Sequence, residues 1–277
     1  MKNFEFKTVK KLYINEIKRK KRSIILWSAA LFGITALYML LFSVVKEMFV
    51  EKMEALPPEL TELFGMSGGS GFTNYNTYFT SVVSILIVAV SAFAASVGSG
   101  IFRDEEATGA IEFTNALPVG RTELWTAKVV AALTVVTAPI LSVTVSALIS
   151  GAIVASDEIA VGSIIAAMLL AYLIVLIFLA VGFLAACGLK KSIKPAPIGL
   201  GILFGTYLLG YLSAIGPDAV SFLKHVSPFD FLSLGGFMSS SAGVGDGAFG
   251  ISGVITALVL IPLLTASAYF LYRKRDF

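Results

Sequence analysis

Charged residues are scarce in this chain: they make up 14% of its 277 residues, against the roughly 25% that is usual in soluble domains. Hydrophobic residues reach 57%, and the mean hydropathy is +0.87. Several windows that lack charge are long enough to cross a bilayer as helix, which takes about 20 residues. These shortages exclude a soluble globular domain and indicate an all-α membrane protein.

Cysteine and histidine occur once each, as Cys187 and His225. One cysteine excludes an intramolecular disulfide framework, and the two residues together are too few for a His/Cys or multi-His metal site. A Ser/His/Asp triad would have to use His225, and the sequence has no GxxxxGK[ST] phosphate loop. We interpret Cys187 as a small buried hydrophobe and His225 as an ordinary interfacial residue, so no catalytic, metal-binding or cofactor-binding residue is predicted.

Six apolar segments are predicted to cross the membrane. They are residues 24–45, 78–102, 127–150, 161–186, 198–215 and 248–272. None of them has an Asp, Glu, Lys or Arg near its centre, and such a residue is the usual sign of an ion or proton path. The pattern argues against a proton- or sodium-coupled carrier and suggests that the energy for any transport comes from elsewhere.

Lysine and arginine indicate the orientation of these spans, because they collect on the cytoplasmic side of membrane proteins. All but three of the 21 lie in residues 1–23, 103–128, 190–194 and 273–275. The exceptions are Lys46, Lys52 and Lys224. We therefore expect a multi-pass protein of the plasma membrane with both termini in the cytoplasm.

Two segments outside the spans are apolar enough to rest on the membrane. In residues 1–23, Phe6, Val9, Tyr13 and Ile17 recur at helical spacing among basic residues, which favours an amphipathic interfacial helix. A frayed basic tail that only fixes topology is the alternative, and a nucleic-acid-binding arm is disfavoured because no reader module accompanies it. Residues 216–250 contain SPFDFLSLGGF, which predicts short interfacial or re-entrant helices before the sixth span.

The one long charged island, residues 101–128, lies between the second and third spans. Residues 107–117 can form a short helix that Pro118 ends. Thr122 is a possible N-cap of the next helix, and Lys128 lies where a long side chain can snorkel to the membrane surface. We interpret residues 102–126 as a cytoplasmic loop that docks another protein, with a solvated acidic turn as the plainer alternative for its paired glutamates.

This island resembles the signature of ABC-2 type transporter permeases. In that signature an acidic pair precedes a Gly, a Leu/Ile-Glu step, a short helix, a Pro, an Arg and a Lys that enters the next span. The matching elements here are Glu105-Glu106, Gly109, Ile111-Glu112, Phe113–Leu117, Pro118, Arg121 and Lys128. Ala110 and Gly120 depart from the usual Thr and Ser, but each replaces one small residue by another.

The resemblance implies that residues 1–277 are a single ABC-2 type transmembrane domain. The island would be a coupling helix that inserts into a cleft of a separate ATP-binding subunit, which would carry the ATP and magnesium. A second permease copy or a homologous permease would complete a dimer. The residues expected to dock the ATPase are Arg103, Glu105, Glu106, Gly109, Ala110, Ile111, Glu112, Phe113, Leu117, Pro118, Arg121 and Lys128.

The function implied is that of the permease subunit of an ATP-driven exporter in a bacterial plasma membrane. Apolar spans without fixed charge favour an amphipathic or hydrophobic cargo, such as a peptide, a lipid or a drug. Two alternatives remain open: a membrane scaffold or regulator that uses the same loop without moving a substrate, and an intramembrane enzyme, for which the spans supply no obvious polar cluster.

Overall fold

The computed structural model describes residues 6–54, 74–107, 120–190, 192–215, 222, 223, 225–241 and 251–274. These residues are helical apart from short connections, and they include no strand. The helices are α1 (Phe6–Leu40), α2 (Phe42–Glu54), α5 (Tyr75–Ala107), α7 (Arg121–Val154), α8 (Val161–Gly188), α9 (Pro195–Ile215), α10 (Pro228–Phe231), α11 (Leu234–Ser241) and α12 (Ile251–Lys274).

Six of the described helices are long and apolar enough to cross a membrane, which confirms the number of predicted spans. The first candidate span, Lys7–Met48, differs most from its prediction of residues 24–45. The expected interfacial segment is helical, but it continues into the first span as the single 35-residue helix α1. The basic residues near the N-terminus therefore lie on the same helix as the first apolar span.

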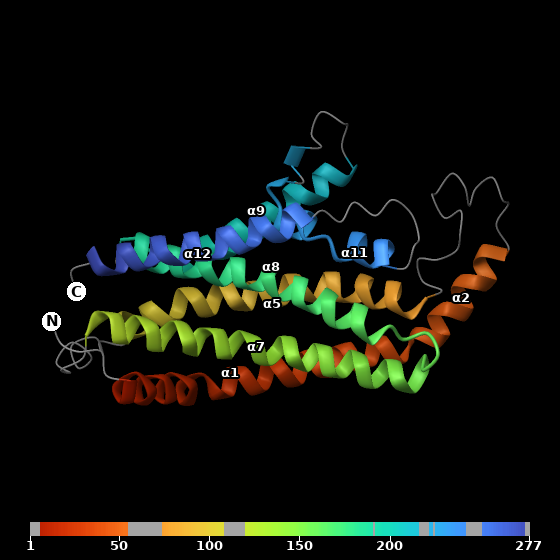
Figure 1. The fold of residues 1–277 in the computed structure, drawn as a ribbon, viewed down its shortest axis with the longest axis horizontal. Coiled ribbons are helices and arrows are strands. Elements are labelled where there is room, and N and C mark those ends of the chain that lie inside the picture. The colour runs from red at the N-terminus through yellow and green to blue at the C-terminus, as the bar shows by residue number, and fades with distance from the viewer. Residues whose placement is uncertain are drawn as a thin grey trace.

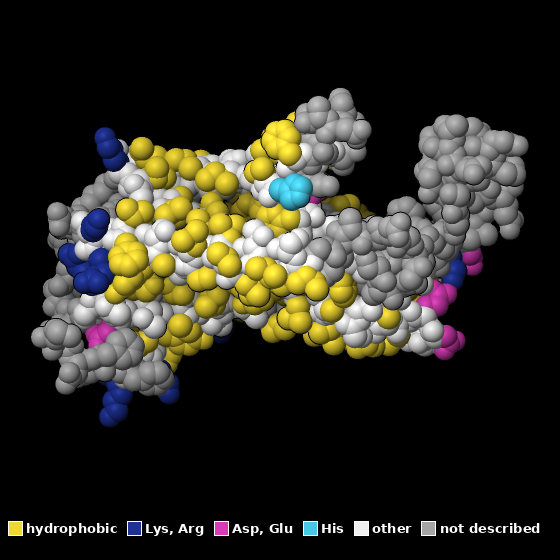
Figure 2. Space-filling view, turned by 45° about the horizontal axis from the view of Figure 1, so that its top comes forward, with side chains coloured by type: hydrophobic (Ala, Val, Ile, Leu, Met, Phe, Trp, Pro, Cys, Tyr) yellow, Lys and Arg dark blue, Asp and Glu magenta, His cyan; other side chains and the backbone are white. Residues whose placement is uncertain are grey.

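The long helices lie side by side, and both chain termini are at one end of the bundle (Figure 1). We call this the terminal end; α2, the start of α5 and the turn between α7 and α8 lie at the opposite end. Lys and Arg gather at the terminal end in Figure 2, whereas most of the visible acidic side chains lie at the opposite end. Between the two ends the described surface is largely hydrophobic, as a lipid-facing surface requires.

Helix α8 lies at the centre of this arrangement and packs against α5, α7, α9 and α12. It is apolar on all sides, as is typical of a helix surrounded by other helices. Its closest crossing is with α5, where Gly98 meets Gly182. A Cβ atom on Gly98 would overlap the Leu179 carbonyl oxygen, and one on Gly182 would lie 2.9 Å from Ser99 N. Only glycines allow the two backbones to approach so closely.

Helix α1 packs mainly along α7 on one side of the bundle. Ser146 donates a hydrogen bond from its hydroxyl to the Phe32 carbonyl oxygen at 2.9 Å, and the Tyr13 and Thr134 hydroxyls lie 3.2 Å apart. The two helices run in the same direction, because the earlier residue of α1, Tyr13, contacts the earlier residue of α7, and Phe32 contacts the later one. The contact of Tyr13 shows that the basic N-terminal half of α1 also lies against α7.

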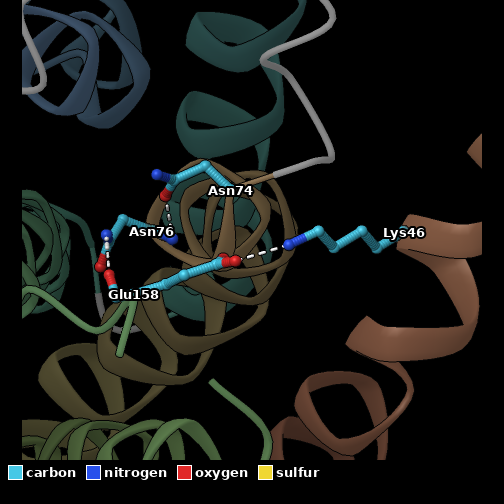
Figure 3. A network of polar contacts seen from close by, with 4 residues as sticks. All are labelled: Lys46, Asn74, Asn76 and Glu158. Carbon is cyan, nitrogen blue, oxygen red and sulfur yellow. Dashed lines mark hydrogen bonds and ion pairs between the residues drawn. The ribbon is translucent and has the colours of Figure 1, made fainter. Parts of the chain in front are cut away.

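A polar network joins three elements at the opposite end (Figure 3). Lys46 of α2 forms an ion pair with Glu158, which lies in the turn between α7 and α8. The Asn76 side chain holds the same turn, since its amide donates to the Glu158 carbonyl oxygen at 2.9 Å and its oxygen accepts from Ala160 N at 3.0 Å. Asn74 in turn accepts from Asn76 N at 2.8 Å. The network therefore fixes the start of α5 to the turn and to α2.

The expectation of short helices before the last span is also confirmed within the described residues. Helices α10 and α11 precede α12, and α11 packs against α5 and α8. Figure 1 shows α12 ending well short of α7 and α8 at the opposite end, with α11 continuing the row of α12. The short helices thus cover the part of α5 and α8 that α12 leaves uncovered.

Candidate functional site

The charged island joins α5 to α7 at the terminal end of the bundle. Helix α5 continues to Ala107, so Glu105 and Glu106 belong to its last turn. The predicted docking residues between the two helices lie outside the described residues, as does the predicted helix of residues 108–117. These docking residues are Gly109, Ala110, Ile111, Glu112, Phe113, Leu117 and Pro118. The structure therefore describes the base of the loop, formed by the end of α5 and the start of α7.

Arg103 binds the end of helix α8 and is only 8% exposed. Its Nε donates to the Ala186 carbonyl oxygen at 3.0 Å, and its Nη2 donates to those of Leu189 and Lys190 at 2.8 and 2.9 Å. The last carbonyls of a helix have no partner within it, and the helix dipole favours a cation there. Arg103 therefore caps α8 and joins it to α5 directly below the loop.

Arg121 makes a similar contact on the other side of the loop. Its Nη1 donates to the Arg273 carbonyl oxygen of α12 at 2.8 Å, although the Arg121 side chain is exposed. Thr122 and Tyr269 place their hydroxyl oxygens 3.2 Å apart across the same two helices. The first turn of α7 is thus attached to the last turns of α12.

The prediction that Thr122 is the N-cap of α7 is wrong. The helix begins at Arg121, and Gly120 is its N-cap. Glu123 lies in the first turn, where the helix dipole favours a negative charge, and its Oε2 accepts a hydrogen bond from Gly120 N at 2.9 Å. Glycine is an acceptable N-cap, and the Glu123 carboxylate satisfies the backbone N–H of this N-cap residue, as the Glu of a capping box does.

Lys128 does not extend to the membrane surface as expected, because its side chain points into the bundle and is 2% exposed. Its Nζ donates to the Ile101 carbonyl oxygen at 2.9 Å and lies 5.8 Å from the centre of the Phe102 ring. A lysine can be buried at such a site because the carbonyl and the ring face both attract its charge. Lys128 therefore joins α7 to α5 at the loop base.

An aromatic cluster fills the space between the four helices at this level. Trp125 of α7 stacks on Phe102 of α5 with ring centres 4.7 Å apart, and Phe102 meets Phe183 of α8 edge to face at 5.5 Å. Tyr269 and Tyr272 of α12 each lie 5.4 Å from Trp125. This cluster was not predicted, although a Phe, a Trp and two Tyr near the ends of the predicted spans were a signal for it.

The base of the loop is therefore tied to α5, α7, α8 and α12 by hydrogen bonds and ring contacts. Arg103, Arg121 and Lys128 all bind backbone carbonyls of neighbouring or adjoining helices. A force applied to the loop would reach all four helices, because none of them can move independently of these contacts. This geometry suits mechanical transmission better than chemistry.

The described residues contain no group of His, Cys, Asp and Glu side chains that could hold a metal ion. Cys187 is buried near the end of α8, in agreement with its interpretation as a small hydrophobe. His225 is exposed and lies beside the carbonyl oxygen of Phe222, with a distance of 3.3 Å from Nδ1. Neither residue takes part in a catalytic arrangement within the described part of the chain.

Comparison with known proteins supports the resemblance that the charged island carries. Residues 12–277, nearly the whole chain, match the ABC-2 family of transporter proteins. Curated proteins give no match. The family is one of membrane components of transporters, and the six apolar helices agree with that role. This chain is therefore a multi-pass membrane protein that belongs to the ABC-2 transporter family.

Proposed function

We propose that this chain is the permease subunit of an ATP-driven exporter, and that a separate subunit binds and hydrolyses ATP. The observation that carries the proposal is the loop base, where Arg103, Arg121 and Lys128 attach the ends of α5 and α7 to α8 and α12. An ATPase that moves the loop would tilt several helices together. The gathering of basic residues at the terminal end supports a cytoplasmic position for this loop.

The predicted contacts with the ATPase divide into two groups. Glu105, Glu106 and Glu112 would meet basic residues of the partner, and Ala110, Phe113 and Leu117 would form an apolar contact face. Arg103 and Lys128 would act indirectly, because they are buried and bind carbonyls within this chain. Arg121 is exposed and bound to α12, so it could serve both roles.

The assembly proposed is a dimer of permease chains, alike or homologous, with ATP and magnesium bound by the partner ATPases. It lies in the plasma membrane of a bacterium and moves an amphipathic or hydrophobic cargo outward. The apolar spans support this cargo class, since none of the six carries a charge near its centre.

Purification from the native membrane tests the proposal. The tagged wild-type protein should bring down a nucleotide-binding subunit and ATPase activity. In the double variant Glu106→Lys with Phe113→Asp, the amount of co-purified subunit and the ATPase activity should each fall at least about tenfold. A tenfold fall is equivalent to roughly 1.4 kcal/mol of binding free energy. Asp157→Lys, a charge reversal in the turn at the opposite end, is the control and should retain both.

Two outcomes would redirect the proposal. A wild-type protein that purifies without any ATPase in several mild detergents would contradict the exporter assignment. If the ATPase binds but an ATPase-dead partner leaves cargo movement unchanged, the chain is a scaffold or regulator, the alternative that the sequence leaves open.

A further inference from the structure

Helix α10 is wedged between α9 and α12, and a glycine on each side makes room for it. A Cβ atom on Gly253 of α12 would overlap the Phe231 carbonyl oxygen. A Cβ atom on Gly210 of α9 would overlap the Asp230 carboxyl group and lie 2.6 Å from Ser227 Oγ. The Asp230 and Ser227 oxygens thus converge on the space that Gly210 leaves open.

This wedge is partly exposed and lies near the middle of the bundle's length. The Phe229 ring stacks on Phe178 of α8, with ring centres 5.4 Å apart. Phe178 is 17 residues after the start of α8 and 10 before its end, which corresponds to about 25 and 15 Å. Gly210 is 15 residues after the start of α9, or about 22 Å from the terminal end. Asp230 therefore brings a carboxyl group to the middle depth of the bundle, although no span carries one there.

Neither oxygen-bearing group has a partner in the described part of the chain. Ser227 is fully buried, and its Oγ makes no hydrogen bond. The Asp230 carboxyl group makes no hydrogen bond or ion pair, although its backbone is bonded within α10. An acidic side chain at membrane depth is costly unless it meets a complementary charge, so its presence without one points to a ligand.

The surroundings decide which ligand fits. Calcium and magnesium need six or more oxygen ligands, whereas the described oxygens nearest the space at Gly210 come from two side chains, those of Asp230 and Ser227. Aromatic rings stand beside them instead: Phe229 meets Tyr207 edge to face at 5.5 Å, and Tyr207 lies one turn of α9 from Gly210. Ring faces and a carboxylate together attract an ammonium group. Tyr207 is 38% exposed, so the site opens towards the side of the bundle.

We propose that Asp230 and Ser227, with the rings of Phe229 and Tyr207, bind the primary ammonium group of an amphipathic amine. The amine donates to the Asp230 carboxylate and to Ser227 Oγ, and its apolar part lies along α9. That the bound amine is cargo rests on the proposed function, whereas its binding does not. The site thus restricts the proposed class of cargo from amphipathic or hydrophobic molecules in general to cationic amphiphiles.

Direct binding to the purified protein in lipid nanodiscs tests the site without the ATPase. The probe is dansylcadaverine, which joins a primary amine to an apolar fluorophore, and its N-acetyl derivative is the neutral counterpart. Wild-type protein should bind the amine saturably and the acetylated compound at least about tenfold more weakly. Asp157→Asn, which removes a surface carboxylate, should bind the amine like the wild type.

Two variants should lose binding by at least about tenfold: Asp230→Asn, which removes the charge, and Gly210→Ala, whose methyl group displaces the carboxyl group. Unchanged binding in both, or no saturable binding by the wild type, overturns the proposal. If either variant is unstable, the proposal is tested by the wild-type protein alone, which should prefer the amine to the acetylated compound. Equal affinity of the wild type for the two compounds overturns the proposal. Co-purification of the ATPase is measured separately, so a failed site leaves the permease assignment intact.

Discussion

Removing the guanidinium of Arg103 should destabilise the protein more than any other single change of a basic residue at the loop base. The variant Arg103→Met keeps the aliphatic part of the side chain but removes the donors to the carbonyls of Ala186, Leu189 and Lys190. Hydrogen bonds to charged groups contribute about 1.5–3 kcal/mol each. Taking the lower value, and allowing water to reach the carbonyls beyond the helix end, we expect a loss of about 2–3 kcal/mol.

The free energy of unfolding of the purified protein, from a denaturing-detergent titration monitored by circular dichroism, measures this loss. Arg121→Met is the matched control, because its side chain is exposed and donates to the Arg273 carbonyl oxygen. It should cost less than about 1 kcal/mol. Arg103→Lys keeps the charge and should recover part of the loss. Equal effects of the two Met variants, within about 0.5 kcal/mol, would refute the capping role of Arg103.

Three further changes test the packing. Gly98→Val should prevent the close approach of α5 to α8 and abolish a monodisperse elution profile, whereas Gly201→Val, which meets open space, should elute normally. Trp125→Ala should lower the free energy of unfolding by about 3–5 kcal/mol, because it removes the centre of the aromatic cluster, and a loss below 1 kcal/mol would contradict that role. Lys46→Ala should cost only about 1 kcal/mol, because the pair with Glu158 is partly exposed, and raising the salt concentration should shrink the difference from the wild type.

The number and order of the spans could be predicted from the sequence because charge exclusion over a bilayer-length window has few other causes. The limits of the spans were less predictable. Nothing in residues 1–23 requires the helix to bend at the membrane surface, so α1 continues through the predicted boundary. The direction in which a charged side chain near the end of a span points could not be predicted from the sequence either. Lys128 is long enough to reach the surface, but the carbonyl of Ile101 and the ring of Phe102 bind its ammonium group inside the bundle.

Asp230 illustrates a second limit. The predicted spans contain no ionisable residue at their centres, but α10 is only four residues long and crosses no membrane by itself. Its depth depends on Gly210, Gly253 and the stacking of Phe229 on Phe178. These contacts join segments far apart in the chain, and a periodicity within one segment carries no information about them.

The docking residues between α5 and α7 remain a prediction. The family match supports the signature from which they were chosen, and the loop base shows what the loop would move. The family resemblance assigned Arg103 and Lys128 to the contact with the partner, because both lie in the island that matches the signature. The burial of Arg103 depends on the end of α8 lying beside α5, and that of Lys128 on its contacts with Ile101 and Phe102 of α5, and neither arrangement can be read from the sequence.

The hydrogen bonds of Arg103 also constrain how the protein is made. Its carbonyl partners lie 83–87 residues further along the chain, so the ribosome must produce two more spans before Arg103 can cap the end of α8. The interval is longer for α1, because the Phe32 carbonyl oxygen accepts its hydrogen bond from Ser146, which is synthesised 114 residues later. The early spans therefore enter the bilayer before their long-range partners exist. A chain truncated after α7 should be inserted yet remain exposed to quality-control proteases.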